Sequence, residues 1–191
     1  GLSKQKAKEE VEQSIDRLIY YAGWSDKFQQ IFSSVNPVAS HHFNFSVLEP
    51  MGVVSVISSN ESALLGLVST IAPIIVGGNT CVVLSSENNP MVSISFAEVL
   101  NTSDVPHGVV NILTGTRKEL IKHFASHMDV NAVSYCGEHD EEIQELEKVS
   151  VENLKRVRVN RGTNWSEDKG QSPYYIERFQ ETKTIWHPNE V

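Results

Sequence analysis

The stretch GVVSVISSNESALLGLVSTIAPIIVGGNTCVVLSSENNP, residues 52–90, decides the fold that we expect for this chain. It opens with a β-branched apolar run over 52–57, which is typical of a buried parallel strand. An apolar segment over 64–76 ends at two glycines, a common helix stop. A second apolar run covers 81–84. Strand, helix and strand joined by short loops predict a right-handed βαβ unit.

Polar residues follow both strands of this unit. Residues 58–61 (SSNE) come directly after the first strand, and residues 85–87 (SSE) come after the second. Ligands of open parallel sheets bind at the carboxyl ends of the strands. We therefore expect the function of the chain to be decided at these two turns.

The rest of the chain extends this unit into a larger sheet. Helix and strand patterns alternate, and they predict an α/β fold with a doubly wound, Rossmann-like parallel sheet of about five strands. The first helix is expected to bury an apolar face made of Val11, Ile15, Leu18, Ile19 and Ala22. The patterns predict helices over 3–33, 90–100, 116–127 and 138–149, and further strands within 105–115 and over 132–135 and 154–159.

Further segments lie outside the sheet pattern. Residues 36–42 are typical of a turn, and 43–48 alternate apolar and polar side chains, as a half-exposed strand does. Near the end, 162–172 is polar without periodicity, which indicates a surface loop. A short helix over 173–180 and a strand over 183–186 are expected to follow.

Composition excludes several classes of function. The chain has 191 residues and a net charge of −8, so one sizeable core is expected and a nucleic-acid partner is not. The longest apolar stretch, 63–76, is too short to span a bilayer. Two cysteines give no disulfide framework, which favours a reducing, cytoplasmic location. His123 and His127 share a helix face without a third ligand, so no metal site is expected. Since Gly1 replaces an initiator methionine, we expect a piece of a longer protein.

Residues 52–90 also resemble, without a gap, the coenzyme-binding core of the aldehyde dehydrogenase superfamily. That family typically reads GVVG, a Pro-Trp-Asn loop, a helix ending in AP and GN, a strand and a Lys-Pro-Ser-Glu turn. The strings YYAGWSDK (20–27) and VPHGVVNILTG (105–115) are similar to the family as well. The matching positions inside the core are Ala72, Pro73, Gly78, Asn79, Thr80, Glu87 and Asn88.

The resemblance implies that the family's reactive positions are altered. The oxyanion-hole asparagine aligns with Glu61, whose carboxylate would repel developing negative charge, and a substitution by Asn60 would require a gap. The general-base glutamate aligns with Asn160, a poor proton acceptor. The nucleophilic cysteine belongs to a catalytic domain that is missing before the last strand. Neither Cys81, expected in the core, nor Cys136, expected to be partly exposed, aligns with it, so no catalytic residue is predicted.

The resemblance implies a damaged coenzyme site as well. The family's ribose-contacting lysine aligns with Leu84, and its pyrophosphate-binding Gly-Ser-Thr string aligns with residues 137–139. Glu138 would bring a carboxylate to a helix N-terminus, where a phosphate would otherwise bind. We therefore expect no cofactor, with NAD disfavoured rather than excluded. The residues that could still touch a dinucleotide are Glu87, Ser85, Gly137 and His139, with Arg117 as a compensating positive charge.

The resemblance further implies an oligomerisation arm. In the family, the strands corresponding to 43–48 and 183–186 belong to oligomerisation elements. We expect them to pair within or across subunits, because unpaired strands would be exposed sheet edges. We expect residues 1–162 to form the coenzyme-binding-like domain with its arm near 40–50, and 163–191 to form a loop, a short helix and the C-terminal oligomerisation strand. The arm residues are expected to be Phe43, Phe45, Val47, Lys183, Ile185 and Trp186.

Three functions are compatible with these features. The endings LKRVRVNRG (154–162) and TKTIWHP (182–188) resemble the truncated second copy of family-sixteen aldehyde dehydrogenases, which favours a non-catalytic domain for oligomerisation or scaffolding. Its partners would be a second copy of itself, an aldehyde-dehydrogenase-like domain of the same protein, or another protein. Alternatively, the chain is a regulatory or structural part of an active NAD-dependent enzyme whose nucleophile lies in another copy. The third hypothesis is an NAD-binding sensor with a remodelled site.

Overall fold

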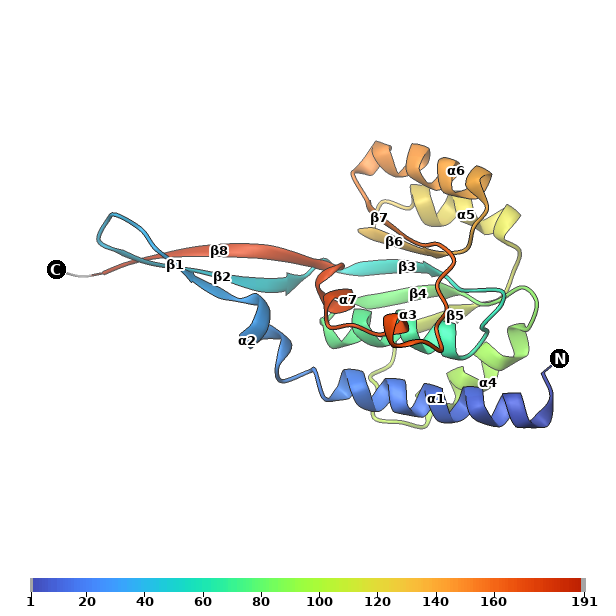
Figure 1. Ribbon diagram of the computed structural model, residues 1–191. Coiled ribbons are helices and arrows are strands. Elements are labelled where there is room, and N and C mark those ends of the chain that lie inside the picture. The colour runs from blue at the N-terminus through green and yellow to red at the C-terminus, as the bar shows by residue number, and fades with distance from the viewer. Residues whose placement is uncertain (1, 190–191) are drawn as a thin grey trace.

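The computed structural model describes residues 2–189, which form a sheet domain with a long arm projecting from it (Figure 1). The domain is built on five parallel strands in the order β5-β4-β3-β6-β7. This order confirms the predicted α/β, doubly wound sheet. The strands are β3 (Val53–Ile57), β4 (Thr80–Leu84), β5 (Val110–Leu113), β6 (Ala132–Cys136) and β7 (Arg156–Asn160).

Helices cover both faces of this sheet (Figure 1). One face carries α1, α3 and α4, and the other carries α5 and α6. Every residue of α3 from Leu65 to Ile74 is buried, because this helix lies between the sheet and α1 and needs apolar side chains on nearly all sides. The helices are α1 (Lys4–Ala22), α3 (Leu65–Val76), α4 (Pro90–Asn101), α5 (Arg117–Ser126) and α6 (Asp140–Ser150).

The sheet divides the hydrophobic core into two halves, because successive side chains of a strand point to opposite faces. On one face, Val54 and Val56 of β3 belong to the same buried cluster as Leu67 and Ile71 of α3. The buried cluster on the other face includes Ile57, Ile121, Val133, Tyr135 and Leu146.

The predicted N-terminal helix over 3–33 is divided in two. α1 ends at Ala22, and the backbone N–H of Gly23 bonds to the carbonyls of Ile19 and Tyr21. A turn separates it from the short helix α2 (Phe28–Phe32).

The predicted apolar face of α1 was wrong. The side chains that α1 buries are Ser14, Arg17 and Tyr21. Arg17 takes the central place because its guanidinium donates to Ser69 Oγ of α3 at 2.6 Å and to backbone carbonyls of the segment after β7. Of the predicted face, Leu18 is half-buried, whereas the exposed members are Val11, Ile15, Ile19 and Ala22.

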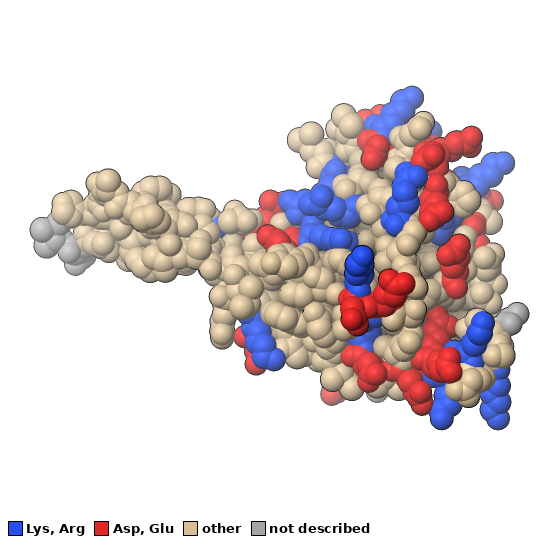
Figure 2. Space-filling model, viewed as in Figure 1, with Lys and Arg blue, Asp and Glu red and all other residues tan. Residues whose placement is uncertain are grey.

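The arm is an antiparallel sheet of three strands in the order β1-β2-β8. Phe45 lies opposite Ile185, so the predicted pairing of the two segments occurs within the chain. The strand β1, which the sequence pattern did not predict, pairs with β2. On the face drawn in Figure 2, the outer part of the arm shows no Lys, Arg, Asp or Glu. The strands are β1 (Ser34–Asn36), β2 (His42–Pro50) and β8 (Gln180–Pro188).

Several other boundaries differ from the predictions. Helix α6 begins at Asp140 rather than at 138. A turn of 3-10 helix, η1 (Val151–Asn153), precedes Leu154, which has a φ of 55°. The last parallel strand therefore begins at Arg156 rather than at the predicted residue 154. The short helix α7 spans only Tyr174–Glu177, because β8 already begins at residue 180. Within residues 2–189, no helix is long and apolar enough to cross a bilayer.

Candidate functional site

The candidate site lies at the carboxyl ends of β3 and β6. The chain winds outward from β3 through β4 and β5, and then crosses to β6 on the other side of β3, which makes this pair the switch point of the sheet. A pocket of about 160 Å³ opens there. Of the six residues singled out for the family's oxyanion hole, general base and coenzyme contacts, four line this pocket, whereas Glu87 and Ser85 do not. The four are Glu61, Gly137, His139 and Asn160.

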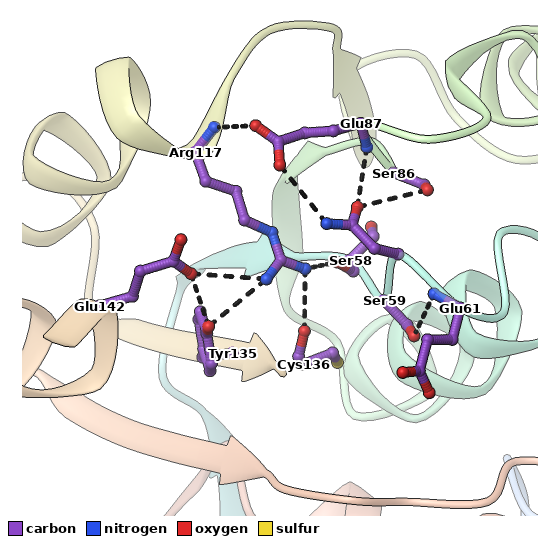
Figure 3. A network of polar contacts seen from close by, with 10 residues as sticks. Ser58, Ser59, Glu61, Ser86, Glu87, Arg117, Tyr135, Cys136 and Glu142 are labelled. Atoms are coloured by element: carbon purple, nitrogen blue, oxygen red, sulfur yellow. Dashed lines mark hydrogen bonds and ion pairs between the residues drawn. The ribbon is translucent and has the colours of Figure 1, made fainter. Parts of the chain in front are cut away.

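The side chain of Arg117 occupies the centre of this edge and is only 3% exposed (Figure 3). Its Nη2 donates to the backbone carbonyl oxygens of Ser58 at 2.5 Å and of Cys136 at 3.0 Å. Its Nη1 donates to Tyr135 Oη and to Glu142 Oε2, both at 3.4 Å. The guanidinium therefore bridges the ends of the two strands, and it is not a free positive charge for a ligand.

Tyr135 and Glu142 complete this network. The phenol of Tyr135 donates to Glu142 Oε2 at 2.5 Å, and the Arg117 guanidinium carbon lies 5.4 Å from the centre of the tyrosine ring. Burial, followed by the hydrogen bond and negative charge of Glu142, raises the pKa of Tyr135 above its ordinary value. Tyr135 is therefore a neutral hydrogen-bond donor at physiological pH.

Glu87 satisfies the N-terminus of α5 rather than facing the pocket. Its Oε1 accepts from the backbone N–H of Arg117 at 2.6 Å, and its Oε2 accepts from Asn60 Nδ2 at 3.4 Å. Asn60 Oδ1 in turn accepts from the Glu87 backbone N–H at 2.9 Å. A carboxylate at a helix N-terminus is stabilised by the helix dipole. Both oxygens of Glu87 thus have partners inside the protein.

The other predicted coenzyme residues differ in exposure. Ser85 is buried, and its hydroxyl has no partner among the described residues. His139 is exposed and caps α6 without a side-chain hydrogen bond. A Cβ at Gly137 would lie 2.8 Å from Tyr135 Oη and 2.9 Å from Arg117 Nη1, so a larger residue there would force these side chains to shift.

The expectation that Glu138 lies at a helix N-terminus was wrong. Glu138 is exposed and precedes His139, the N-cap residue of α6. The carboxylates of the first turn are instead those of Asp140, Glu141 and Glu142.

The positions aligned with the family's reactive groups, Glu61 and Asn160, differ in their surroundings. Glu61 is exposed at the rim of the pocket. The Asn160 amide donates weakly to Ser134 Oγ at 3.4 Å and to Cys136 Sγ at 3.6 Å. Its Oδ1 accepts from Arg178 Nη1 at 2.9 Å. These contacts hold Asn160 as a structural amide at the end of β7.

Both thiols are buried, so the expectation that Cys136 is partly exposed was wrong. Cys136 is 2% exposed because it packs against Leu65 and Trp165. Burial is the main cause that raises the pKa of the Cys136 thiol, and burial raises the pKa of Cys81 to about 12. Neither cysteine supplies a thiolate at neutral pH.

Trp165 is the residue that sequence reasoning missed most clearly. It lies in the segment 162–172, which was expected to be a surface loop, yet it is 5% exposed. The Arg17 guanidinium donates to the Trp165 backbone carbonyl at 2.8 Å and fixes this segment to α1. A tryptophan inside an otherwise polar run was the available signal. Across residues 2–189, no three His, Cys, Asp or Glu side chains are placed to hold a metal ion.

The fold and the position of the site define an α/β protein built on a dinucleotide-binding type of sheet. Residues 1–166 match the family model described as "Aldehyde dehydrogenase family", and the chain belongs to this family.

Named relatives support this assignment. The chain is 33% identical to "Aldehyde dehydrogenase, cytosolic 1" of Mus musculus over 87% of its own length and 31% of the relative's. It is 29% identical to "Cytosolic 10-formyltetrahydrofolate dehydrogenase" of Xenopus laevis, covering 88% of this chain and 18% of that one. The chain thus spans about a third or less of the length of these relatives.

Solved structures agree with the fold. PnpE from Pseudomonas sp. WBC-3 matches with a TM-score of 0.75 and 27% identity, covering 80% of this chain and 31% of that one. PnpE in complex with nicotinamide adenine dinucleotide matches with a TM-score of 0.73.

Proposed function

We propose that this chain is a non-catalytic aldehyde-dehydrogenase-like domain that serves assembly within a longer protein. The observation that carries the proposal is the arm, which projects from the sheet domain with its outer edges open (Figure 1). The open strand edges of such an arm are templates for pairing with another chain or domain.

The edges of the arm lack the usual protection against pairing. β8 pairs with β2 alone among the described strands, and β1 covers only part of the other edge. Residues 33–48 contain no Asp, Glu, Lys or Arg, and the ion pair between Lys183 and Glu49 lies at the base of the arm. Phe43 and Trp186 expose 46% and 57% of their surface. Within β8, Glu181 and Lys183 lie near the base, and the outer residues 184–188 carry no Asp, Glu, Lys or Arg. An uncharged outer edge of this kind favours pairing with another strand.

The geometry of the site supports the absence of catalysis. The two thiols are buried and protonated, and the base position holds Asn160 within hydrogen bonds to its neighbours. The anion-stabilising position holds the carboxylate of Glu61, which disfavours an oxyanion. We propose no cofactor, because Arg117 and Glu87 occupy the edge where a dinucleotide would bind.

The larger protein is part of this proposal. We propose that residues 1–162 are the coenzyme-binding-like domain and residues 163–191 its C-terminal addition, as in a truncated second copy of a family-sixteen aldehyde dehydrogenase. The partner of the arm would be a second copy of the chain or an aldehyde-dehydrogenase-like domain of the same polypeptide. The word "cytosolic" in the names of relatives supports a cytoplasmic location.

A second candidate is a structural or regulatory part of an active enzyme. The observation that favours it is length, since relatives named as dehydrogenases are about three times longer than this chain. The nucleophile would then lie elsewhere in the full protein. An NAD sensor is less well supported, because the carboxylate of Glu87 already binds Arg117 and Asn60.

Sedimentation velocity tests the assembly role. We expect the chain to self-associate and the double variant Phe43→Asp with Trp186→Asp to sediment as a monomer, because charges on the arm oppose strand pairing. Met91→Asp is the matched control, since Met91 is 71% exposed on α4, away from the arm. A wild-type chain that remains monomeric at all concentrations would contradict self-association, and binding to a separate domain of the full protein would then be the remaining form of the proposal.

A further inference from the structure

The polar groups that meet between β3 and β6 are hydrogen-bond acceptors. They are the backbone carbonyls of Ser58 and Cys136, the phenol oxygen of Tyr135 and the carboxylate of Glu142, and all four contact the terminal nitrogens of Arg117 (Figure 3). A guanidinium presents a planar set of donors that matches such acceptors, whereas a phosphate needs donors. The local chemistry therefore suits a planar cation.

The shape of the site fits the same ligand. The absence of a side chain at Gly137 leaves the space that the guanidinium uses, since a Cβ there would come within 2.9 Å of Arg117 Nη1. The ring of Tyr135 lies 5.4 Å from the guanidinium carbon, within the range of a cation–π contact.

The charges around the edge oppose an anion. Glu87 accepts from the first residue of α5, and Glu142 lies in the first turn of α6. A carboxylate thus accepts from the N-terminus of α5, and another lies near the N-terminus of α6, which weakens the attraction of these helix ends for a phosphate. Glu61 and Glu138 line the adjoining pocket and add negative charge at its mouth.

We propose that the carboxyl edge between β3 and β6 is a guanidinium-binding site, which Arg117 fills from within the chain. The chemical class of its ligand is an alkylguanidinium cation, and the site discriminates against dinucleotide phosphates. This inference deepens the proposed function. It depends on that proposal in one respect, namely that no cofactor binds at this edge. A failure of the arm to assemble would leave it intact.

Chemical rescue tests this assignment. Arg117→Ala removes the atoms that ethylguanidinium can restore. We expect the variant to melt roughly 5–10 °C below the wild type, because charged and backbone acceptors lose their donor. Ethylguanidinium at about 20 mM, far below denaturing concentrations of guanidinium salts, should recover about 1–3 °C. Ethylammonium at the same concentration should recover less, since it lacks the planar donors.

A matched variant separates the site from general effects of the ion. Arg178→Ala removes a half-buried arginine that contacts the Tyr175 ring and Asn160. Ethylguanidinium should not stabilise this variant or the wild type. Equal stabilisation of both arginine variants would overturn the proposal.

Anions test the proposed discrimination against phosphates. NAD and pyrophosphate should raise the melting temperature of neither the wild type nor Arg117→Ala. If either anion stabilises Arg117→Ala more than ethylguanidinium does, the edge is an anion site and the proposal is wrong.

A measurement on the wild type keeps the proposal testable if Arg117→Ala does not fold. Because four acceptors surround the Nη atoms, we expect the Arg117 Nη protons to exchange slowly with water in nitrogen-edited NMR spectra. The signal is assigned by its loss in Arg117→Lys. Rapid exchange, like that of an exposed arginine such as Arg161, would overturn the proposal.

Discussion

At the scale of single residues, the geometry of the carboxyl edge depends on Arg117, whose guanidinium donates to the backbone carbonyls of Ser58 and Cys136 beside Gly137. The resemblance to the aldehyde dehydrogenase family aligns Glu61 with the oxyanion-hole asparagine and Asn160 with the general base, and both residue types argued against these roles. The position of the Arg117 guanidinium was not predictable, because its partners are backbone carbonyls that leave no trace in the sequence. Cys136 was misjudged because Trp165, which covers it, comes from a segment without periodicity.

The close approach at Gly137 gives a first prediction. Gly137→Ala should lower the free energy of unfolding by about 1–3 kcal/mol, because the new methyl group overpacks the space beside Arg117 and Tyr135. Gly23→Ala is the control: its φ is −66° and its nearest atom would lie 3.4 Å from the new Cβ. Denaturant titrations compare the two. Equal stability of Gly137→Ala and the wild type would contradict the packing described at the site.

The burial of Cys136 gives a second prediction. The native chain should react slowly with a thiol reagent at neutral pH, because both thiols are buried and their pKa values are raised. Trp165→Ala should accelerate modification of Cys136 roughly tenfold or more, since reactivity follows access. Phe43→Ala on the arm should leave the rate unchanged. Fast labelling of Cys136 in the wild type would show that Trp165 does not cover it.

At the scale of elements, hydrophobic patterns predicted the parallel strands and the paired strands of the arm, but they gave the wrong buried face for α1. The five parallel strands and α3 were predicted within a few residues. β3, β4, β6 and α3 are largely apolar runs, whereas β5 and β7 are half-buried strands at the edges of the sheet. The face of α1 was wrong because one buried arginine, Arg17, links it to α3 and to the segment after β7. A polar anchor of this kind has no periodic signal.

The finding that α1 buries Arg17 rather than the predicted apolar face can be tested by unfolding measurements. Arg17→Met should lower the free energy of unfolding by about 2–4 kcal/mol, because Ser69 and two backbone carbonyls lose a charged donor in a buried place. Ile15→Gln on the exposed side should change it by less than about 0.5 kcal/mol. If Ile15→Gln is the more damaging substitution in thermal or denaturant unfolding, the helix buries the predicted apolar face after all.

At the scale of the whole molecule, a fold of the aldehyde dehydrogenase family occurs together with a carboxyl edge that Arg117 fills from within the chain. The chain keeps the sheet of the aldehyde dehydrogenase family and an arm whose pairing within the chain was predicted as one of two forms. In our proposal, Glu61 and Asn160 take the places that the family resemblance assigns to catalysis, and Arg117 fills the edge where a ligand would bind. The sequence could not identify the partner of the arm, because an open strand edge can pair with many different strands.

Calorimetric titration of the wild-type chain with NAD tests this account most directly. We predict no saturable heat, because Arg117 bridges Ser58 and Cys136 and Glu87 occupies the N-terminus of α5. Saturable binding with a sub-millimolar dissociation constant would show that the edge still accepts a dinucleotide, and it would contradict the central claim that this copy of the fold has lost its coenzyme site.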